Sequence, residues 1–352
     1  MTGRSCFYSA VRLCKGKIMN KVDVIIPIYK PDKGFFALMD MLSKQTVPVD
    51  RIILMNTEER YFNQLIYGTT FKEKYKNVVV YHHSKREFDH GNTRNRAVKR
   101  SEADVFIMMT QDAIPADEFL VEKLLEPLKK DKIAISYARQ LPKQDASEIE
   151  SFVRSFNYPD EDMVKSKEDL ERLGVKTYFC SNVCAAYKRR IFVELGGFVR
   201  HTIFNEDMIF AAKAVRAGYS IAYAAGARVY HSHNYTNKEQ FKRNFDLGVS
   251  QADHPEVFEG IPSESEGKKL VKLTREHFRK EKKQKELIKF YVNCAFRLMG
   301  YKLGKNYKRL PKALIKRFTM NRDYWRYYQM KREVSRIDAT KGYGKNVDKE
   351  GE

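Results

Sequence analysis

Cysteine is scarce in this 352-residue sequence, and its spacing suits neither a disulfide framework nor a zinc site. No CxxC pair is present, and no second group of Cys or His lies near enough in sequence to Cys180 and Cys184 to complete a zinc site. We therefore expect reduced thiols that pack as small buried hydrophobic residues, and this excludes a disulfide-bonded secreted scaffold. The cysteines concerned are Cys6, Cys14, Cys180, Cys184 and Cys294.

The sequence also lacks long apolar runs. No stretch of about 18 uncharged apolar residues occurs, so no transmembrane helix is predicted. The nearest candidate, 287–301, is interrupted by Lys289 and Arg297. Residues 1–18 contain no apolar core of signal-peptide length, and Met19 is suited to be a start. We interpret residues 1–18 as a disordered extension or an upstream-start artefact.

Acidic residues are too few to balance the basic ones. The sequence has 66 Lys and Arg against 45 Asp and Glu, a net charge of +21 with a pI near 9.6. Between Lys268 and Arg336, 23 basic and 5 acidic residues account for +18 of this charge. Such an excess indicates a polyanionic partner. No nucleic-acid-binding module is recognisable, so nucleic acid is not the expected partner.

The basic stretch also contains interleaved aromatic and aliphatic residues. This mixture is typical of amphipathic helices that lie on an anionic membrane surface. A solvated helical appendage and a contact between two copies of the chain are the alternative interpretations. The residues that form the pattern are Phe290, Tyr291, Phe296, Leu298, Leu310, Leu314, Ile315, Phe318, Trp325 and Tyr328.

Short β-branched apolar runs alternate with segments of helical periodicity in the first part of the chain. This alternation predicts an α/β fold with a doubly wound, mostly parallel sheet, in which ligands bind beyond the carboxyl ends of the strands. Residues 27–29, 56–58 and 111–112 should therefore surround one crevice. The predicted strands cover 22–29, 51–55, 77–82 and 104–110, and the predicted helices cover 35–45 and 94–100.

The following part of the chain is more mixed. The ranges 132–140 and 176–187 contain strand-like runs, a strand is predicted over 220–230, and short helices are predicted over 189–195 and 207–217. From residue 263 onward we expect helices rich in Lys and Arg. The sequence thus predicts an α/β domain over 19–262. A basic helical region follows over 263–352, contacting a membrane or a second copy and ending in a disordered segment.

Two strand ends carry residues that suit a divalent cation. Asp112 follows the strand over 104–110, where a carboxylate can hold a cation against a diphosphate; a turn or N-cap aspartate is the alternative. His231 and His233 follow the strand over 220–230, and residues two apart on extended backbone face the same side. Imidazoles bind Mn²⁺ or phosphate, although a solvated pair in a loop is the simpler interpretation.

Two helix starts carry further candidates. Glu206 and Asp207 precede an apolar helix, where Asp207 suits a general base and where capping also explains the carboxylates. Arg94 lies in a polar turn that leads into a helix, where it suits phosphate binding. Each signal is weak alone, and a capped loop explains Arg94 equally well.

Six motifs occur in an order that resembles the inverting family 2 glycosyltransferases with the GT-A fold, specifically the bacterial rhamnosyltransferase-like branch. The likeness covers about residues 19–260. The motifs are VIIPIYKP (24–31), FDHGNTRNRA (88–97), MMTQDAIP (108–115), YFCSNVCAAYKRRIFVELGGF (178–198), NEDMIFAAKAVRAGY (205–219) and VYHSHNY (229–235).

The resemblance implies a role for each matching residue. Asp207 would be the catalytic base and Glu206 its neighbour in the catalytic pair. Asp112 and His231 would hold Mn²⁺ or Mg²⁺, since residues 110–112 keep only the last carboxylate of the family's DxD motif. Arg94 would touch the diphosphate. The full set of implied donor-binding residues is Pro27, Tyr29, Glu58, His90, Arg94, Gln111, Asp112 and His233.

The resemblance also implies an activity. We expect an inverting, metal-dependent transferase that uses dTDP-L-rhamnose to extend a lipid-linked glycan of a capsule, O-antigen or wall polysaccharide. It would act as a peripheral protein on the inner, cytoplasmic face of the cell membrane. A UDP-hexose donor is the first alternative. A non-catalytic, membrane-bound GT-A-like scaffold is the second, and the presence of Asp112, Asp207 and His231 argues against it.

Overall fold

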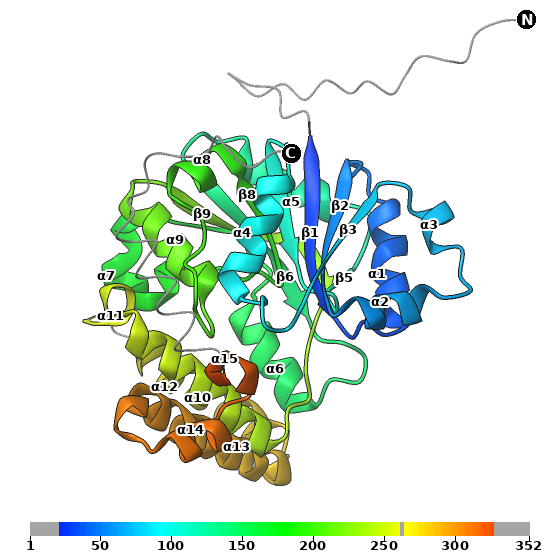
Figure 1. Cartoon of the computed structure of the whole chain (residues 1–352). Coiled ribbons are helices and arrows are strands. Elements are labelled where there is room, and N and C mark those ends of the chain that lie inside the picture. The colour runs from blue at the N-terminus through cyan, green and yellow to red at the C-terminus, as the bar shows by residue number, and fades with distance from the viewer. Residues whose placement is uncertain (1–20, 261–263, 327–352) are drawn as a thin grey trace, which may run out of the picture.

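A nine-stranded sheet forms the centre of the molecule (Figure 1). The computed structural model describes residues 21–260 and 264–326, so the expected extension over 1–18 and the expected disordered end of the chain lie outside the described residues. The strands lie side by side in the order β3 (Val78–His83), β2 (Arg51–Thr57), β1 (Val22–Tyr29), β4 (Val105–Met109), β8 (Cys184–Lys188), β6 (Ile133–Leu141), β9 (Ser220–Tyr230) and β5 (Ile114–Pro115), and β7 (Met163–Lys165) pairs with β9.

The sheet is mostly parallel, as predicted. β1 runs parallel to β2 and to β4, β2 to β3, and β6 to β9. β8 is antiparallel to β4 and β6, and the short strands β5 and β7 are antiparallel to β9. The predicted α/β class is thus confirmed, and the reversal at β8 marks where the simple doubly wound pattern ends.

Helices cover both faces of the sheet, which is why its central strands are apolar on both sides. Ile26 of β1 packs with α1 and α5 on one face, whereas the adjacent Ile25 packs with α4, α8 and α9 on the other. The α-helices of this part are α1 (Gly34–Ser43), α2 (Glu59–Ile66), α3 (Phe71–Lys74), α4 (His90–Arg100), α5 (Leu120–Leu128), α6 (Glu148–Asn157), α7 (Leu170–Leu173), α8 (Arg189–Glu194), α9 (Glu206–Arg216), α10 (Asn237–Asp253) and α11 (Pro255–Phe258).

The strand-like run predicted within 176–187 is confirmed near its end, in β8. The start of this range overlaps a 3₁₀ helix, Gly174–Tyr178. The buried ammonium of Lys165 donates to the carbonyl oxygens of Lys176, at 3.1 Å, and of Phe179. These two carbonyl groups therefore have hydrogen-bond partners although the segment before β8 does not pair with a neighbouring strand.

The cysteines within the described residues behave as predicted. Cys180 and Cys184 are buried, Cys294 is half-buried, and all three are free thiols. Burial raises the pKa of Cys180 to about 12, so this thiol stays protonated near neutral pH. Cys6 and Cys14 lie outside the described residues.

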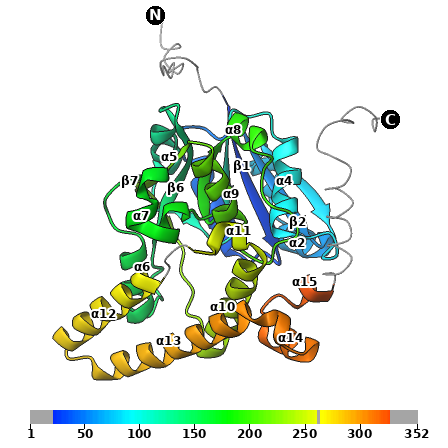
Figure 2. The same cartoon turned by 90° about the vertical axis from the view of Figure 1, so that its left-hand side faces the viewer.

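The basic helices lie together below the sheet (Figures 1 and 2). Their close packing on α10 depends on glycine: a Cβ atom on Gly300 would lie 2.2 Å from the carbonyl oxygen of Phe241, and one on Gly304 would lie 2.1 Å from that of Phe245. The elements are α12 (Glu264–Lys280), α13 (Gln284–Lys305), α14 (Lys312–Phe318) and α15 (Arg322–Arg326), with a 3₁₀ turn at Tyr307–Arg309.

This packing divides the apolar residues of the basic region into two sets. Phe290 and Ile315 are buried, and Phe318 and Trp325 pack against the small core that joins α10 to the end of the described chain. Asp246 of α10 accepts hydrogen bonds from the Thr319 hydroxyl at 2.6 Å and from the backbone N–H groups of Met320 and Asn321. The basic helices are therefore an integral part of the described structure. The division at residue 262 stays a prediction.

The second set forms an exposed apolar face on α13. Its members recur at helical spacing, opposite the side that packs on α10. They are Ile288, Tyr291, Val292, Leu298 and Met299, and their exposed fractions lie between 41% and 63%. No helix within the described residues is both long and apolar enough to cross a membrane.

The glycine contacts between α10 and α13 generate a stability prediction. Gly304→Ala should lower the free energy of unfolding by about 1–3 kcal/mol, because the added methyl group collides with backbone that cannot move aside. Gly267→Ala, at a helical position with open space around its Cβ, is the matched control and should be neutral or stabilising by up to about 1 kcal/mol. Urea unfolding measures both, and equal midpoints for the two variants would contradict the packing.

Candidate active site

A cavity of about 510 Å³ opens at the sheet edge where β4, β6 and β9 end. Its wall also includes the starts of α4 and α9 and side chains of α6, α10 and α13. This is the edge at which ligands bind in open α/β sheets. Two groups of polar and charged residues that could take part in chemistry lie along it.

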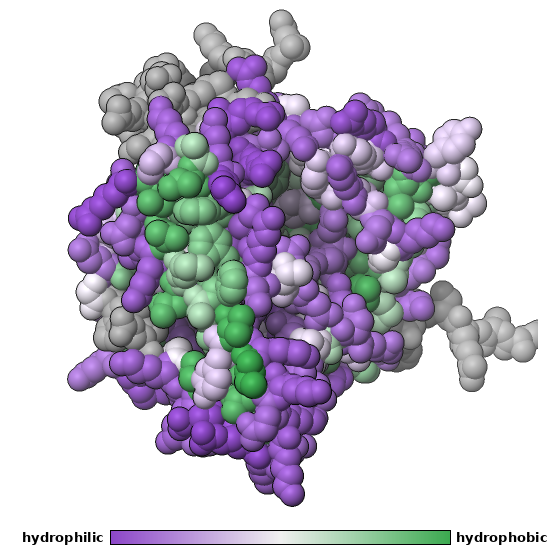
Figure 3. Space-filling model, turned by 90° about the horizontal axis from the view of Figure 1, so that it is seen from below, coloured by the Kyte–Doolittle hydropathy of each residue, from purple (hydrophilic) through white to green (hydrophobic). Residues whose placement is uncertain are grey.

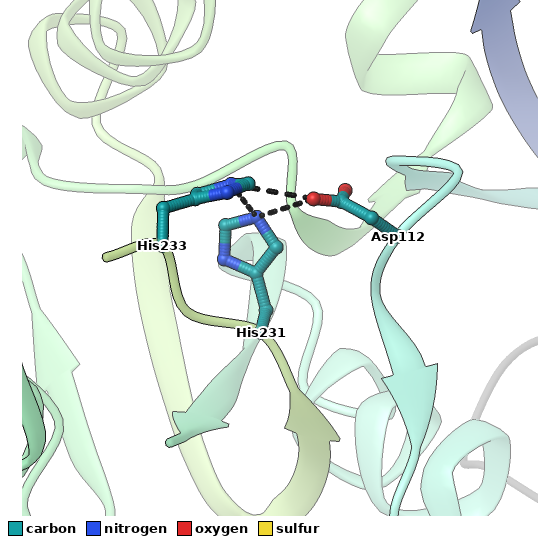
Figure 4. Close-up of side chains that lie close together, drawn as sticks. All are labelled: Asp112, His231 and His233. Carbon is teal, nitrogen blue, oxygen red and sulfur yellow. Dashed lines mark hydrogen bonds and ion pairs between the residues drawn. The ribbon is translucent and has the colours of Figure 1, made fainter. Parts of the chain in front are cut away.

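The first group joins the ends of two strands. Asp112, from the turn after β4, meets His231 and His233, which follow β9 (Figure 4). The Nε2 atoms of His231 and His233 lie 3.5 Å and 3.2 Å from the same oxygen, Oδ2 of Asp112. One possible metal-ligand atom of each residue lies within 4.8 Å of the other two, close enough for the three to bind one ion. Both imidazoles thus face the same side, as the spacing predicts.

Local hydrogen bonds fix how this group is presented. The backbone N–H of His231 donates to the carbonyl of Leu141 at 2.9 Å, which continues the pairing of β9 with β6 by one residue. Nδ1 of His231 lies 3.0 Å from Oε1 of Gln140, an oxygen that can only accept. In the neutral form of the ring, Nδ1 would carry the proton and Nε2 would offer its lone pair to a cation.

The protonation states suit a cation as well. Burial alone would raise the pKa of Asp112, but the hydrogen bond and positive charge that His231 offers in its protonated form, with the Thr110 hydroxyl and His233, hold that pKa well below its usual range. Burial lowers the pKa of His233 to about 4, so this ring is neutral near pH 7. One carboxylate and two imidazoles are a set that accepts Mn²⁺ and similar divalent ions.

The second group lies at the start of α9. The two oxygens of Asp207 accept hydrogen bonds from the backbone N–H groups of Asn182, at 3.0 Å, and of Met208, at 2.8 Å. The side-chain amide of Asn182 also donates to Glu206, at 3.1 Å. Asn182 thus holds both carboxylates, and it was not among the predicted site residues although it lies inside one of the motifs.

Arg94 forms an ion pair with one of these two acids, Glu206. Its Nη1 atom lies 3.3 Å from Oε1 of Glu206, both side chains are buried, and the same nitrogen donates to the carbonyl of His90 at 2.8 Å. Burial would raise the pKa of Glu206, but the charges of Arg94 and His90 lower it, so Glu206 is ionised. Burial and the adjacent Glu206 charge raise the pKa of Asp207. Arg94 therefore has a partner within the protein that the sequence did not predict.

The remaining predicted residues lie at the neighbouring ends of β1 and β2. Gln111 makes two hydrogen bonds with the backbone of Tyr29: the N–H of Tyr29 donates to Oε1 of Gln111 at 2.8 Å, and Nε2 of Gln111 donates to the carbonyl of Tyr29 at 3.1 Å. Glu58 adopts a φ of 65° and accepts from the backbone N–H of Lys85 at 2.8 Å. The ammonium of Lys85 lies 4.9 Å from the ring centre of Tyr29. Pro27 is half-buried on β1 beside Met55 of β2.

The structure thus brings the predicted residues together in three clusters along one edge. Asp112, His231 and His233 form one, and the acids of α9 with Arg94 and His90 form another, with both lining or touching the cavity. Tyr29, Glu58 and Gln111 form the third and lie outside the cavity lining. Gln140, at the end of a predicted strand, is a site residue that strand-end position alone would have identified.

Comparisons with known proteins agree on one family. A family model described as "Glycosyl transferase family 2" matches residues 23–196. An O-antigen chain rhamnosyltransferase of Salmonella typhimurium is 38% identical over 318 residues, which is 88% of this chain and 97% of the relative. An O-antigen chain rhamnosyltransferase of Salmonella anatum is 38% identical over 321 residues, with coverages of 88% and 98%.

A solved structure extends the likeness to the fold. A mannosyltransferase from Pyrobaculum calidifontis, in complex with GDP-Man and Mn²⁺, superposes with a TM-score of 0.53 over 93% of this chain and 88% of its own. Its sequence is 13% identical, so the likeness concerns the fold alone.

The convergence of three ligand atoms generates a binding prediction. Asp112→Ala should weaken Mn²⁺ binding by at least about tenfold, because the carboxylate supplies the negative charge of the cluster. Titration followed by electron paramagnetic resonance of free Mn²⁺ measures the affinity. His254→Ala is the matched control, since His254 lies outside the cluster and pairs with Glu256 at 3.0 Å. Unchanged Mn²⁺ affinity in Asp112→Ala would remove this cluster from consideration as the metal site.

Proposed function

The chain belongs to glycosyl transferase family 2 and has the predicted GT-A type of fold, and on this premise we propose that it is an inverting rhamnosyltransferase. It would transfer L-rhamnose from dTDP-L-rhamnose to a lipid-linked precursor of a cell-surface polysaccharide. The observation that carries the proposal is 38% identity to two O-antigen chain rhamnosyltransferases over nearly their whole lengths. The clusters around Asp112 and Asp207 supply the groups that such a transfer needs.

The donor would bind along the sheet edge. Pro27, Tyr29 and Glu58 would border the base and ribose, because they lie at the ends of β1 and β2, next to the turn that carries Asp112. Asp112, His231 and His233 would hold Mn²⁺ or Mg²⁺, and the ion, when bound, supplies positive charge against the donor's diphosphate. The further donor contacts proposed are His90, Arg94 and Gln111.

Asp207 would accept the proton of the acceptor hydroxyl. Its oxygens are fixed by the N–H groups of Asn182 and Met208, and its raised pKa makes it a stronger base than an ordinary aspartate. The acceptor oxygen then bonds to the anomeric carbon while the bond from that carbon to the diphosphate breaks, which inverts the configuration. Glu206, paired with Arg94, would supply the negative charge that raises the pKa of Asp207.

Membrane attachment is a separate proposal that rests on α13. Its exposed apolar face is flanked by exposed lysines, among them Lys285, Lys289 and Lys302. Figure 3 shows the underside of the molecule, with a band of hydrophobic residues bordered by hydrophilic ones. Apolar burial combined with basic residues suits the surface of an anionic bilayer. We propose that this face attaches the protein to the inner surface of the membrane.

The proposed activity is tested by incubating the protein with dTDP-L-rhamnose, UDP-glucose or UDP-galactose and a lipid-linked acceptor. We expect turnover with dTDP-L-rhamnose and an inverted anomeric configuration in the product, determined by NMR. Preference for a UDP-hexose would leave the family assignment intact and overturn the donor. A protein that neither transfers nor hydrolyses any of these donors would support the scaffold alternative.

Substitution of the proposed base sharpens this test. Asp207→Asn should lower kcat by about 10²-fold or more while donor affinity is kept, because the amide preserves shape but cannot take a proton. In the wild type, kcat/KM should rise with pH through the raised pKa of Asp207, since only the ionised form accepts a proton. Glu206→Gln removes the neighbouring negative charge and should move this acidic limb to lower pH. An Asp207→Asn variant with near-normal kcat would exclude Asp207 as the base.

The membrane proposal is tested by changing the exposed face without disturbing the fold. Deletion from Lys268 onward would strip α13 from α10, so point substitutions are preferable. The double variant Ile288→Ser/Leu298→Ser should bind phosphatidylglycerol vesicles several-fold more weakly than the wild type in co-sedimentation at high salt, where apolar burial carries more of the binding.

Tyr67→Ser is the matched control, because Tyr67 is 89% exposed, the highest fraction among large hydrophobic residues in the described ranges, and lies far from α13 in the sequence, after α2. Equal loss in both variants would indicate a nonspecific effect. If the double variant changed the oligomeric state instead of vesicle binding, the face would be a contact between two copies.

A further inference from the structure

Four arginines line the active-site cavity, and they differ in whether the protein already satisfies their charge. Arg94 pairs with Glu206, and Arg154 pairs with Glu150. In the part of the chain that the structure describes, Arg243 and Arg297 make no ion pair with a carboxylate. Two guanidinium groups thus face a catalytic cavity with charge available for a ligand.

Aromatic rings hold Arg243 near the proposed metal site. Its guanidinium carbon lies 4.8 Å from the ring centre of Phe204 and 5.7 Å from that of Tyr235. Tyr235 in turn stacks on His233, with ring centres 4.9 Å apart. Stacking on aromatic faces leaves the edge of a guanidinium free to donate hydrogen bonds. Arg243, on α10, thus contacts Tyr235, and the ring of Tyr235 lies between Arg243 and His233 of the metal-binding candidate cluster.

Arg297 extends the positive charge onto α13. Its side chain is half-buried, and burial together with the charge of Arg243 lowers its pKa, while Cys294 and Glu150 oppose this shift. Two neighbouring cations at a partly buried place are disfavoured unless an anion lies between or beside them. Glu150 is the acid that faces Arg297, but its carboxylate is taken by Arg154.

A second cavity, of about 530 Å³, leads away from this point. It shares Tyr235, Glu150 and Arg297 with the active-site cavity and continues between α6, α10 and α13. Its lining also includes Ile288 and Val292, which belong to the exposed apolar face of α13. The second cavity therefore adjoins the active-site cavity at Arg297 and reaches that face.

We propose that Arg243 and Arg297 form an anion subsite for the phosphate or diphosphate group of the acceptor, and that the acceptor's apolar chain follows the second cavity to Ile288 and Val292. Guanidinium groups bind phosphate through paired hydrogen bonds. The two arginines, followed by the apolar side chains of Ile288 and Val292, suit an amphiphile with an anionic group. This inference rests on the proposed function only in naming the amphiphile as the acceptor.

The subsite is tested by direct binding of three probes to the wild type, Arg243→Gln and Arg297→Gln. The probes are farnesyl diphosphate in EDTA, inorganic pyrophosphate in EDTA, and dTDP with Mn²⁺, all measured by titration calorimetry. Each substitution should weaken farnesyl diphosphate binding by at least about tenfold, since a charge-assisted hydrogen bond is lost. Binding of dTDP with Mn²⁺ should change less than about twofold. The wild type should bind farnesyl diphosphate more tightly than pyrophosphate.

Arg190→Gln is the matched control, because Arg190 lies on α8, away from both cavities, and is 72% exposed. Loss of dTDP affinity equal to the loss of farnesyl diphosphate affinity would assign the two arginines to the donor's diphosphate and overturn the proposal. Unchanged binding of every probe would also overturn it. Normal probe binding by a protein that transfers no sugar would refute the proposed function and leave the subsite standing.

Discussion

The ion pair between Arg94 and Glu206 is the interaction on which the catalytic half of the structure depends. Two adjacent carboxylates at the buried start of α9 repel each other, and Arg94, 3.3 Å from Glu206, is the cation that makes the arrangement tolerable. Removing one partner of a buried pair costs about 3–5 kcal/mol. The pair also joins α4 to α9, and Gly91 lets α4 approach the chain so closely that a Cβ there would lie 1.8 Å from the carbonyl of Val199.

The mixed direction of the sheet explains how one cavity acquires two chemically different walls. β4 and β9 end at the same edge and bring a carboxylate and two imidazoles together. β8 runs antiparallel to β4 and β6, so the segment that precedes β8 lies at that edge and carries Asn182 to the start of α9. The wall that carries the carboxylate and two imidazoles and the wall that carries the two acids of α9 thus face a common space.

The sequence was sufficient for features that depend on strand ends and on spacing. Asp112 and the two histidines could be predicted to meet, because strand alternation and a two-residue spacing place them. The partners of Arg94 and Asn182 could not, since those contacts join segments that no local pattern relates. The start of the strand within 176–187 could not be predicted either, since the contacts of Lys165 with the carbonyls of Lys176 and Phe179 also join segments that no local pattern relates.

The glycine packing of α13 has a consequence for which acceptors fit. Gly300 and Gly304 hold α13 closely against α10, so this packing sets how far the exposed face of α13 lies from the cavity that contains Asp207. For an acceptor whose apolar end rests at that face, this distance would set a minimum length. A glycan would have to reach that length before its terminal hydroxyl could contact Asp207. Helix packing, rather than contacts with individual sugars, would then select the length of the acceptor.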